Sequence, residues 1–324
     1  MSEALIATLT GESHTLGAIS DDVDPRVDDD FQLALHVAYE LHYRSFDGVD
    51  DGWEWHPAVL SFTRALERRF ETALRDDITL GPCASADIVA ELPALLDRAD
   101  GPSLSSYVLT EGTLHELREF AIHRSAYQLK EADPHTWAIP RLTGEAKAAL
   151  VRMQNDEYGN GVANAMHSTL FADTMVALGL DPTYGAYVDQ LPGATLATGN
   201  LVTMFGLHRR LRGALVGHLA GFEMTSVVPM TRYSRALRRL GVARRGRHFY
   251  DVHVEADAVH EQVALHDMVG MFVRDEPEMT NEVLFGAQAL MDVESRFASA
   301  LLSAWQHGRT SLLTAEPEGF ADIA

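Results

Sequence analysis

The chain has 324 residues, of which 46% are hydrophobic, and it carries a formal charge of −21 at pH 7. It is long enough to bury a core as one large or two small domains, and its acidity disfavours general binding to nucleic acid or to an anionic membrane, because phosphate groups would be repelled over most of the surface. The single Cys83 excludes an intramolecular disulfide and a CxxC metal site, so any bound metal would need histidine and carboxylate ligands. There is no apolar run of 18 residues and no basic start of a signal peptide, so we expect a cytoplasmic protein that does not enter a membrane.

The first third of the chain predicts a solvated lead-in followed by three helices. Residues 1–30 are rich in Gly, Ser, Thr and Asp, which is typical of a solvated segment. Helical patterns follow at about 31–46, 57–75 and 86–98. A Gly-Pro-Ser run at 101–103 marks a junction. We therefore expect an N-terminal helical portion over 1–105, packed on a core domain over 106–324.

The rest of the chain also has helical periodicity. Helices are predicted at about 111–132, 144–178, 195–222, 226–240, 248–273 and 277–305. No segment alternates apolar and polar residues as a strand does, so the sequence predicts an all-α protein. Gly159 and Gly161 interrupt one pattern, and each costs up to about 1 kcal/mol relative to alanine in a helix, which indicates close packing or a local bulge. Glu157 and His167 would lie roughly 80° apart on a regular helix, and a bulge would change that offset.

One predicted helix carries three candidate metal ligands on a single stripe. On an α-helix, His253, Asp257 and His260 fall within a sector of roughly 60°. Two imidazoles and a carboxylate suit iron, manganese or zinc, and ligands from other helices could complete a two-metal site. The competing interpretation is a chance triplet on a solvated face, since the chain has 15 histidines.

Two glutamates outside that stripe also point to a cation. Glu131 is expected in the last turn of its helix, where the helix dipole disfavours an anion unless a positive charge neutralises it. An exposed glutamate at a frayed end is the alternative. Glu223 stands in mostly apolar company, so it is either capped or bound to something.

These residues together resemble the ligand pattern of the haem-oxygenase-like diiron oxidases and oxygenases, which are iron-containing redox enzymes. The resemblance covers about 110–300 and rests on three pieces of sequence. These are Lys130-Glu131-Ala132-Asp133-Pro134-His135, Asp156-Glu157-Tyr158-Gly159 through Met166-His167, and the stripe His253/Asp257/His260. The family implies a seven-helix bundle like that of haem oxygenase, with two iron ions, O2 as co-substrate and no haem. An additional N-terminal helical portion would precede that bundle here.

The resemblance also implies how the ligands are shared between the two irons. Glu131, His167 and His260 would hold one iron. Glu157 and His253 would hold the other, with Asp257 completing it or bridging. Some members have a further glutamate seven residues after the first one in the second core helix, where this chain has Asn164, so Glu223 is a candidate substitute from another helix.

The leading hypothesis is a nonhaem diiron oxygenase or oxidase that acts on a small amino-acid-derived or fatty-acid-like metabolite in natural-product biosynthesis. N-oxygenation of an amine or guanidine is ranked first, with desaturation and oxidative C–C cleavage as alternatives. An enzyme with one metal or none on the same bundle is a further alternative. So is a non-catalytic helical binding module that uses the arginine cluster at 232–247 as its contact surface. The oligomeric state stays open, with a homodimer among the options.

Overall fold

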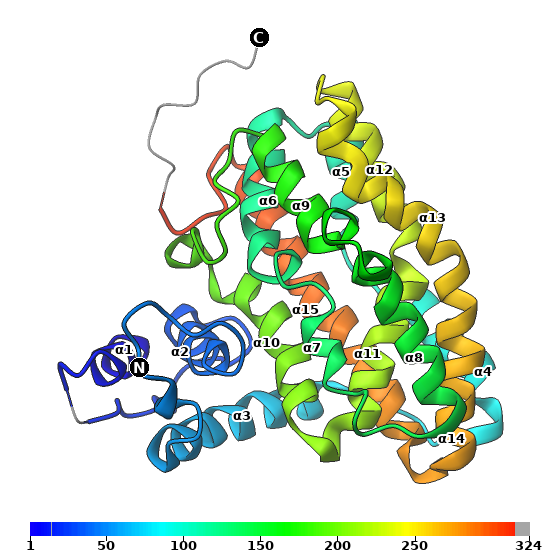
Figure 1. Ribbon diagram of the computed structural model, residues 1–324, viewed down its shortest axis with the longest axis horizontal. Helices are drawn as coiled ribbons and strands as arrows, with labels where there is room; N and C mark the ends of the chain where they lie inside the picture. The colour runs from blue at the N-terminus through cyan, green and yellow to red at the C-terminus, as the bar shows by residue number, and fades with distance from the viewer. Residues whose placement is uncertain (14, 315–324) are drawn as a thin grey trace.

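The computed structural model describes residues 1–13 and 15–314, and every regular element in that part of the chain is a helix. The prediction of an all-α protein is confirmed. The long C-terminal helix α15 (Thr280–Gln306) runs through the bundle and packs against α10 (Gly193–Leu207) and α11 (Arg212–Thr225), as Figure 1 shows. The other helices of the core part are α5 (Leu104–Thr110), α6 (Leu114–Gln128), α7 (Asp133–Thr136), α8 (Gly144–Glu157), α9 (His167–Ala177), α12 (Val227–Arg239), α13 (His248–Gln262) and α14 (Met271–Asp275).

The crossing of α11 and α15 depends on two glycines that let the backbones touch. A Cβ atom at Gly217 would lie 1.8 Å from the carbonyl oxygen of Val283, and one at Gly286 would lie 1.9 Å from that of Ala214. No side chain fits at either place, so each glycine receives the other helix's backbone. Both helices are largely apolar and buried along this contact, which places the core there.

The N-terminal portion contains α1 (Ser2–Leu9), α2 (Asp29–Glu40), α3 (Pro57–Asp77) and α4 (Ile88–Asp97). Helix α2 packs on α10, and Leu5, Phe31 and Leu35 belong to the same hydrophobic cluster as residues of α10 and α11. In Figure 1, α1 and α2 (blue) lie at one side of the bundle and α3 runs along its base, whereas α4 (cyan) lies at the opposite side. A division of the chain near residue 105 stays a prediction.

The expectation of a solvated lead-in over 1–30 was wrong for its first residues. Residues 2–9 form α1, and Leu5 within it is fully buried. Asp30 accepts hydrogen bonds from the N-terminal amine (2.6 Å) and from the Ser2 hydroxyl (2.5 Å). The polar composition of the whole segment masked this short apolar stretch.

Two of the long helical patterns are in fact pairs of helices. The pattern at 144–178 is broken between α8 and α9, where Gly159, Asn160 and Gly161 all have positive φ angles, of 63°, 53° and 79°. The pattern at 195–222 is broken between α10 and α11. By contrast, the pattern at 248–273 is one continuous helical run, in which α13 passes through a π-helical segment (Val263–Gly270) into α14.

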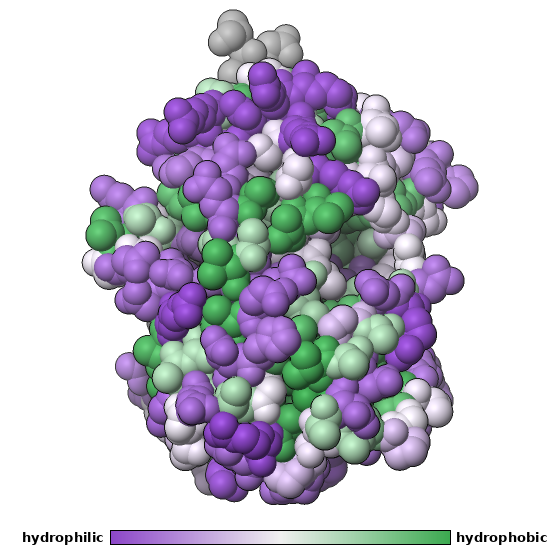
Figure 2. All heavy atoms as spheres, turned by 90° about the vertical axis from the view of Figure 1, so that its right-hand side faces the viewer, coloured by the Kyte–Doolittle hydropathy of each residue, from purple (hydrophilic) through white to green (hydrophobic). Residues whose placement is uncertain are grey.

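Figure 2 shows the face on the right-hand side of Figure 1, where hydrophobic patches are interspersed with hydrophilic residues. Among the described helices, none combines the length and apolar character needed to cross a bilayer.

Candidate metal centre

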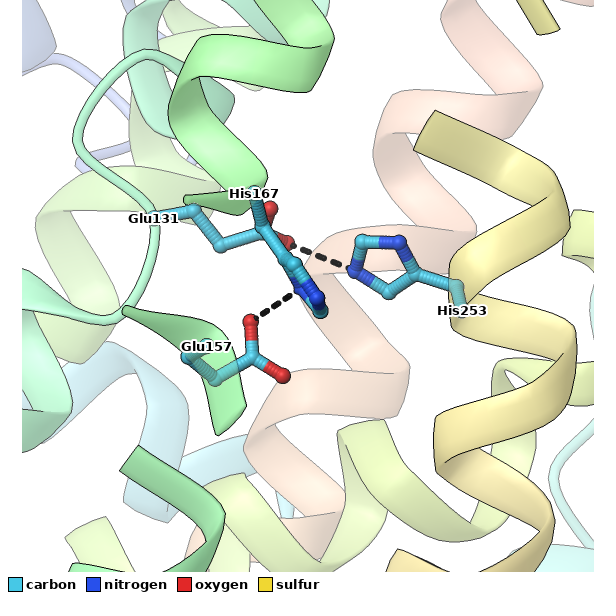
Figure 3. Close-up of side chains that lie close together, drawn as sticks. All are labelled: Glu131, Glu157, His167 and His253. Carbon is cyan, nitrogen blue, oxygen red and sulfur yellow. Dashed lines mark ion pairs between the residues drawn. The ribbon is translucent and has the colours of Figure 1, made fainter. Parts of the chain in front are cut away.

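Four of the predicted site residues meet in the middle of the bundle, and they come from four different places in the chain. Glu131 lies in the turn after α6, Glu157 ends α8, His167 begins α9, and His253 lies on α13. Their side chains point toward one another in Figure 3. One ligand atom from each lies within 4.8 Å of one from every other, a spacing that a single metal ion can span.

A second group of three adjoins the first. Ligand atoms of Glu157, Asp257 and His260 also lie within 4.8 Å of one another. Glu223 belongs to the same place, since its Oε2 atom is 3.3 Å from Nδ1 of His260. All seven residues singled out in the sequence therefore gather in one cluster, and Glu157 is common to both groups.

The turn that carries Glu131 differs from the helix end expected there. Helix α6 ends at Gln128, so Glu131 stands in the following turn and not in a last helical turn. Ala132 adopts a positive φ of 75°, and its carbonyl accepts a 2.8 Å hydrogen bond from the Gln154 side chain of α8. Arg44 of the N-terminal portion donates to the Leu129 carbonyl at 3.2 Å. These contacts hold the turn and place the Glu131 carboxylate inside the bundle.

The helix break between α8 and α9 brings Glu157 and His167 together. Oε2 of Glu157 lies 2.6 Å from Nδ1 of His167. A regular helix would have placed the two side chains roughly 80° apart and almost three turns from each other. A Cβ at Gly159 would lie 2.5 Å from the backbone carbon of Ala165, so the tight turn requires glycine at this position.

Hydrogen bonds to the outer nitrogens of two histidines fix which nitrogen faces the cluster. Nδ1 of His253 lies 2.8 Å from the carbonyl oxygen of Phe249 and must donate to it, which leaves Nε2 as the unprotonated atom of the neutral ring, 3.4 Å from Glu131. Nε2 of His260 lies 3.0 Å from the Asp156 carboxylate, which leaves Nδ1 facing Glu223. Metal-binding histidines are held by such outer contacts.

Two buried nitrogen atoms in the cluster have carboxylates nearby but no hydrogen bond. Nδ1 of His167 and Nδ1 of His260 are both buried without a hydrogen-bond partner among the described residues, although a glutamate oxygen lies 2.6 Å and 3.3 Å away, respectively. Each nitrogen therefore faces a carboxylate oxygen without the geometry of a hydrogen bond. A cation between them would satisfy both, so the residues present fit a metal.

The electrostatics of the protein without metal point the same way. Burial raises the pKa of Glu157 to about 7 and that of Asp257 to about 6, and it also raises the pKa of Glu131 and Glu223. Burial opposes a charge on His260, yet the neighbouring Glu223 raises its pKa to about 9. Several carboxylates thus compete for few positive charges in a dry place, and a divalent cation would relieve that competition.

Residues 118–295, more than half of the chain, match the sequence pattern of the family described as iron-containing redox enzymes. The chain belongs to this family. The iron-containing redox enzymes have the haem-oxygenase-like fold, so the expected fold class is confirmed, and the matched residues include all seven of the cluster. The family makes the chain an oxidoreductase and supports iron as its metal.

Among individual proteins, one similar in sequence is a nitrosourea synthase from Streptomyces achromogenes subsp. streptozoticus. The two are 27% identical over 136 residues, which is 42% of this chain and 29% of the synthase. The match spans less than a third of the synthase. The activity of the synthase therefore does not transfer directly to this chain.

Two crystal structures of a CADD-like protein of unknown function from Nostoc punctiforme share the fold. In one, at 16% identity and a TM-score of 0.54, the match covers 68% of this chain and 97% of the other. In the second, at 15% identity and a TM-score of 0.52, it covers 72% and 99%. At these identities the similarity concerns the fold alone.

The distances between ligand atoms group the candidate ligands differently from the division between two irons that the resemblance implied. His260 lies with Asp257 and Glu157, whereas Glu131 and His167 lie with His253. The reason is the direction of α13, which places His253 and His260 almost two turns apart, so the two imidazoles reach opposite ends of the cluster.

Three residues that contact the cluster were not singled out in the sequence. Asp156 holds His260, and the Ser226 hydroxyl donates to Asp257 at 2.5 Å. With its amide nitrogen toward Glu131, Gln128 donates to both carboxylate oxygens, at 2.6 and 3.0 Å. They are ordinary polar residues beside or within a few positions of ligand candidates, and nothing in the pattern of the sequence distinguishes them from surface residues.

Proposed function

We propose that this oxidoreductase is a nonhaem diiron enzyme that uses O2. One iron would be held by Glu131, Glu157, His167 and His253. The other would be held by Glu157, Asp257 and His260, with Glu223 beside it. The observation that carries the proposal is the sharing of Glu157 between two groups of mutually close ligand atoms. The proposal includes no haem, because histidines mixed with carboxylates form a nonhaem donor set.

Iron bound at these residues would supply the redox chemistry that O2 activation requires. The chain's own residues prepare the place. Asp156 and the Phe249 carbonyl hold the outer protons of His260 and His253, so that each ring presents a lone pair inward. The carboxylates offset the charge of two cations. Leu219 and Phe222 line the small pocket at the cluster and give it an apolar wall.

For the reaction, we propose N-oxygenation of a small amino-acid-derived metabolite, supported by the similarity to a nitrosourea synthase. In such a reaction, one oxygen atom of O2 enters a nitrogen–oxygen bond, and the other leaves as water after taking up two electrons and two protons from an external two-electron donor. Desaturation or oxidative C–C cleavage at the same site are the alternatives. Product mass separates the three reactions: an added oxygen atom, two lost hydrogens, or two smaller products.

The alternative of a non-catalytic binding module has lost its basis. The family makes the chain an oxidoreductase. Several arginines of the 232–247 cluster also have partners inside the molecule. Arg239 donates to the carbonyls of Val108, Leu109 and Gly112 at the end of α5, and Arg245 pairs with Asp173 at 2.8 Å.

Metal counting tests the diiron proposal. Protein loaded anaerobically with Fe(II) and freed of excess metal should retain close to two irons per chain, and replacing His253 or His260 by alanine should lower that number. His266→Ala is the matched control, because His266 lies on the same helical run but is exposed. Retention of one iron or none by the parent protein would contradict the proposal.

A further inference from the structure

A cavity of about 290 Å³ lies directly beside the candidate metal centre. It is lined by residues of α6, α9, α11, α12, α13 and α15 and of the segment 99–105. Four residues line both this cavity and the small pocket of the centre: Gln128, Phe222, Ser226 and Met230. The two spaces therefore adjoin at these four side chains, which places a molecule bound in the cavity next to the centre.

The size and lining of the cavity restrict what it can hold. Its volume corresponds to about ten water molecules at roughly 30 Å³ each, which suits a small metabolite and is too little for a long lipid chain. Its walls are largely aromatic. The rings are those of Phe120, Phe171, Phe222, Tyr233, Phe249, Tyr250 and Phe297.

An arginine–glutamate pair is the partly buried charged feature of this aromatic cavity, whose lining also includes the exposed Asp100. Arg124 of α6 donates to both carboxylate oxygens of Glu294 of α15, at 2.8 and 2.6 Å. The guanidinium lies over the Phe297 ring, 4.3 Å from its centre. Arginine has five N–H groups, and among the described residues only Glu294 accepts from Arg124. Both partners therefore keep hydrogen-bonding capacity for a ligand.

Two tyrosines beside the pair have hydroxyl groups with no hydrogen-bond partner in the described part of the chain. Tyr233 and Tyr250 line the cavity, their rings are 5.8 Å apart, and they are only 8% and 4% exposed. Neither hydroxyl has a hydrogen-bond partner among the described residues. A buried phenol normally finds one, so these two hydroxyls are available to a polar group of a bound molecule.

Charge balance selects the kind of head group that fits here. The pair of Arg124 and Glu294 is neutral as a whole. A lone carboxylate or a lone ammonium would leave a net charge among largely aromatic walls, which is costly. A zwitterion adds no net charge, because its carboxylate can take the free N–H groups of Arg124 while its ammonium takes the free lone pairs of Glu294.

The geometry of α6 sets how far such a head group lies from the centre. Arg124 and Gln128 are one helical turn apart, about 6 Å along the axis, and Gln128 in turn contacts Glu131. An α-amino group bound at the pair is thus too far from the cluster to react there. A side chain of several atoms would bridge the gap at Gln128 and Met230, where the two spaces adjoin.

We propose that this cavity binds an α-amino acid, with its carboxylate at Arg124 and its ammonium at Glu294, and directs the far end of a long side chain to the metal centre. The inference rests on the proposed function and narrows its substrate class. It assigns oxidation to the end of the side chain and leaves the α-amino group unchanged.

Ligand binding tests the head-group site without turnover. Protein loaded with Zn(II), which has no redox chemistry, and protein free of metal are titrated by calorimetry with L-ornithine, L-lysine, L-arginine and L-norleucine. At least one should bind saturably, and its Nα-acetyl and methyl ester forms should bind at least tenfold more weakly. Equal binding of the blocked forms, saturable binding of hexanoate alone, or no binding by any of the four amino acids would overturn the proposal.

A matched pair of variants tests the arginine itself. Arg75 makes the same two-pronged contact with Glu282 of α15, at 3.0 and 2.9 Å, and lies 4.0 Å over Phe285, but it is outside the cavity. Arg124→Lys should weaken amino-acid binding at least tenfold, and Arg75→Lys should leave it unchanged. An equal effect of the two replacements, or none from either, contradicts the assignment.

Two further measurements keep the outcomes separate. If Arg124→Lys fails to fold, Tyr250→Phe, which removes only the hydroxyl, should still weaken binding several-fold, and unchanged binding would count against the site. Iron counting and head-group binding are independent. Fewer than two irons with intact zwitterion selectivity would sink the diiron proposal alone, whereas two irons with no such selectivity would sink the cavity assignment alone.

Discussion

At the scale of single residues, the centre depends on side chains that touch the candidate ligands as much as on the ligands themselves. Asp156 is such a residue, because its carboxylate holds Nε2 of His260 at 3.0 Å and thereby keeps Nδ1 facing inward. The sequence alone predicted His260 from its place on a helical stripe. It could not predict Asp156, since that contact joins two helices 104 positions apart in the chain.

Asp156→Asn should weaken metal binding at the end of the cluster formed by Asp257 and His260. The amide keeps the shape but no longer accepts a proton as strongly, so the imidazole is held less firmly and is a poorer ligand, by about 10- to 100-fold in affinity. Competition with a metal chelator measures the change. Asp267→Asn, at an exposed position after α13, should have no effect. Equal affinities for the two variants would contradict the role given to Asp156.

His123 should make stability depend on pH below neutrality. Burial lowers its pKa to about 3, so it stays neutral in the folded protein while the unfolded chain takes up a proton below about 6.5. The contribution of the neutral, buried His123 ring to the free energy of unfolding is therefore complete above pH 6.5 and is lost as the pH falls toward 3. Relative to His123→Gln, the parent should lose about 2 kcal/mol of unfolding free energy between pH 6.5 and 4.5. Urea unfolding at both pH values checks this, and a constant difference would refute it.

At the scale of elements, the break between α8 and α9 matters more than either helix. The glycines at 159 and 161 allowed the sequence to predict a disturbance near Glu157. They did not allow it to predict that the chain turns so sharply that the end of α8 meets the start of α9. That outcome depends on three successive residues with positive φ and on backbone contact with Ala165, which local preferences do not contain.

Replacing the two glycines separately should distinguish these causes. At Gly161 a Cβ meets open space, so Gly161→Ala costs only the left-handed backbone, about 1–2 kcal/mol. At Gly159 a Cβ would also collide with backbone 2.5 Å away, so Gly159→Ala should destabilise the protein more and separate Glu157 from His167. Thermal unfolding and iron content measure the two effects. Normal iron content in Gly159→Ala would show that the turn does not position the pair.

At the scale of the whole molecule, the N-terminal portion supports a centre that lies in the family's matched segment. Glu40 at the end of α2 pairs with buried Lys130, next to Glu131, and accepts a 2.5 Å hydrogen bond from the Tyr184 hydroxyl. The predicted packing of helices before 105 onto the core did not indicate this contact. Hydrophobic periodicity identifies apolar faces, whereas a buried ion pair between distant segments has no periodic signature.

Glu40→Gln should therefore damage both stability and the centre. It leaves the ammonium of Lys130 buried without a counter-charge, which costs about 3–5 kcal/mol, and it loosens the turn that carries Glu131. Replacing Glu40 and Lys130 together by methionine removes both charges and should recover most of the lost stability. Urea unfolding of the single and double variants measures the coupling. Additive losses would show that the pair is not coupled.

The glycine crossing of α11 and α15 has a consequence for how a substrate enters. The backbones of α11 and α15 are in direct contact at Gly217 and Gly286. The two helices therefore cannot slide or rotate against each other without steric collision, and they form a rigid pair. Any opening of the amino-acid cavity must then come from its other walls, namely α6, α9, α12, α13 and the segment 99–105. A substrate would therefore enter when one of these other walls moves relative to the fixed pair of α11 and α15.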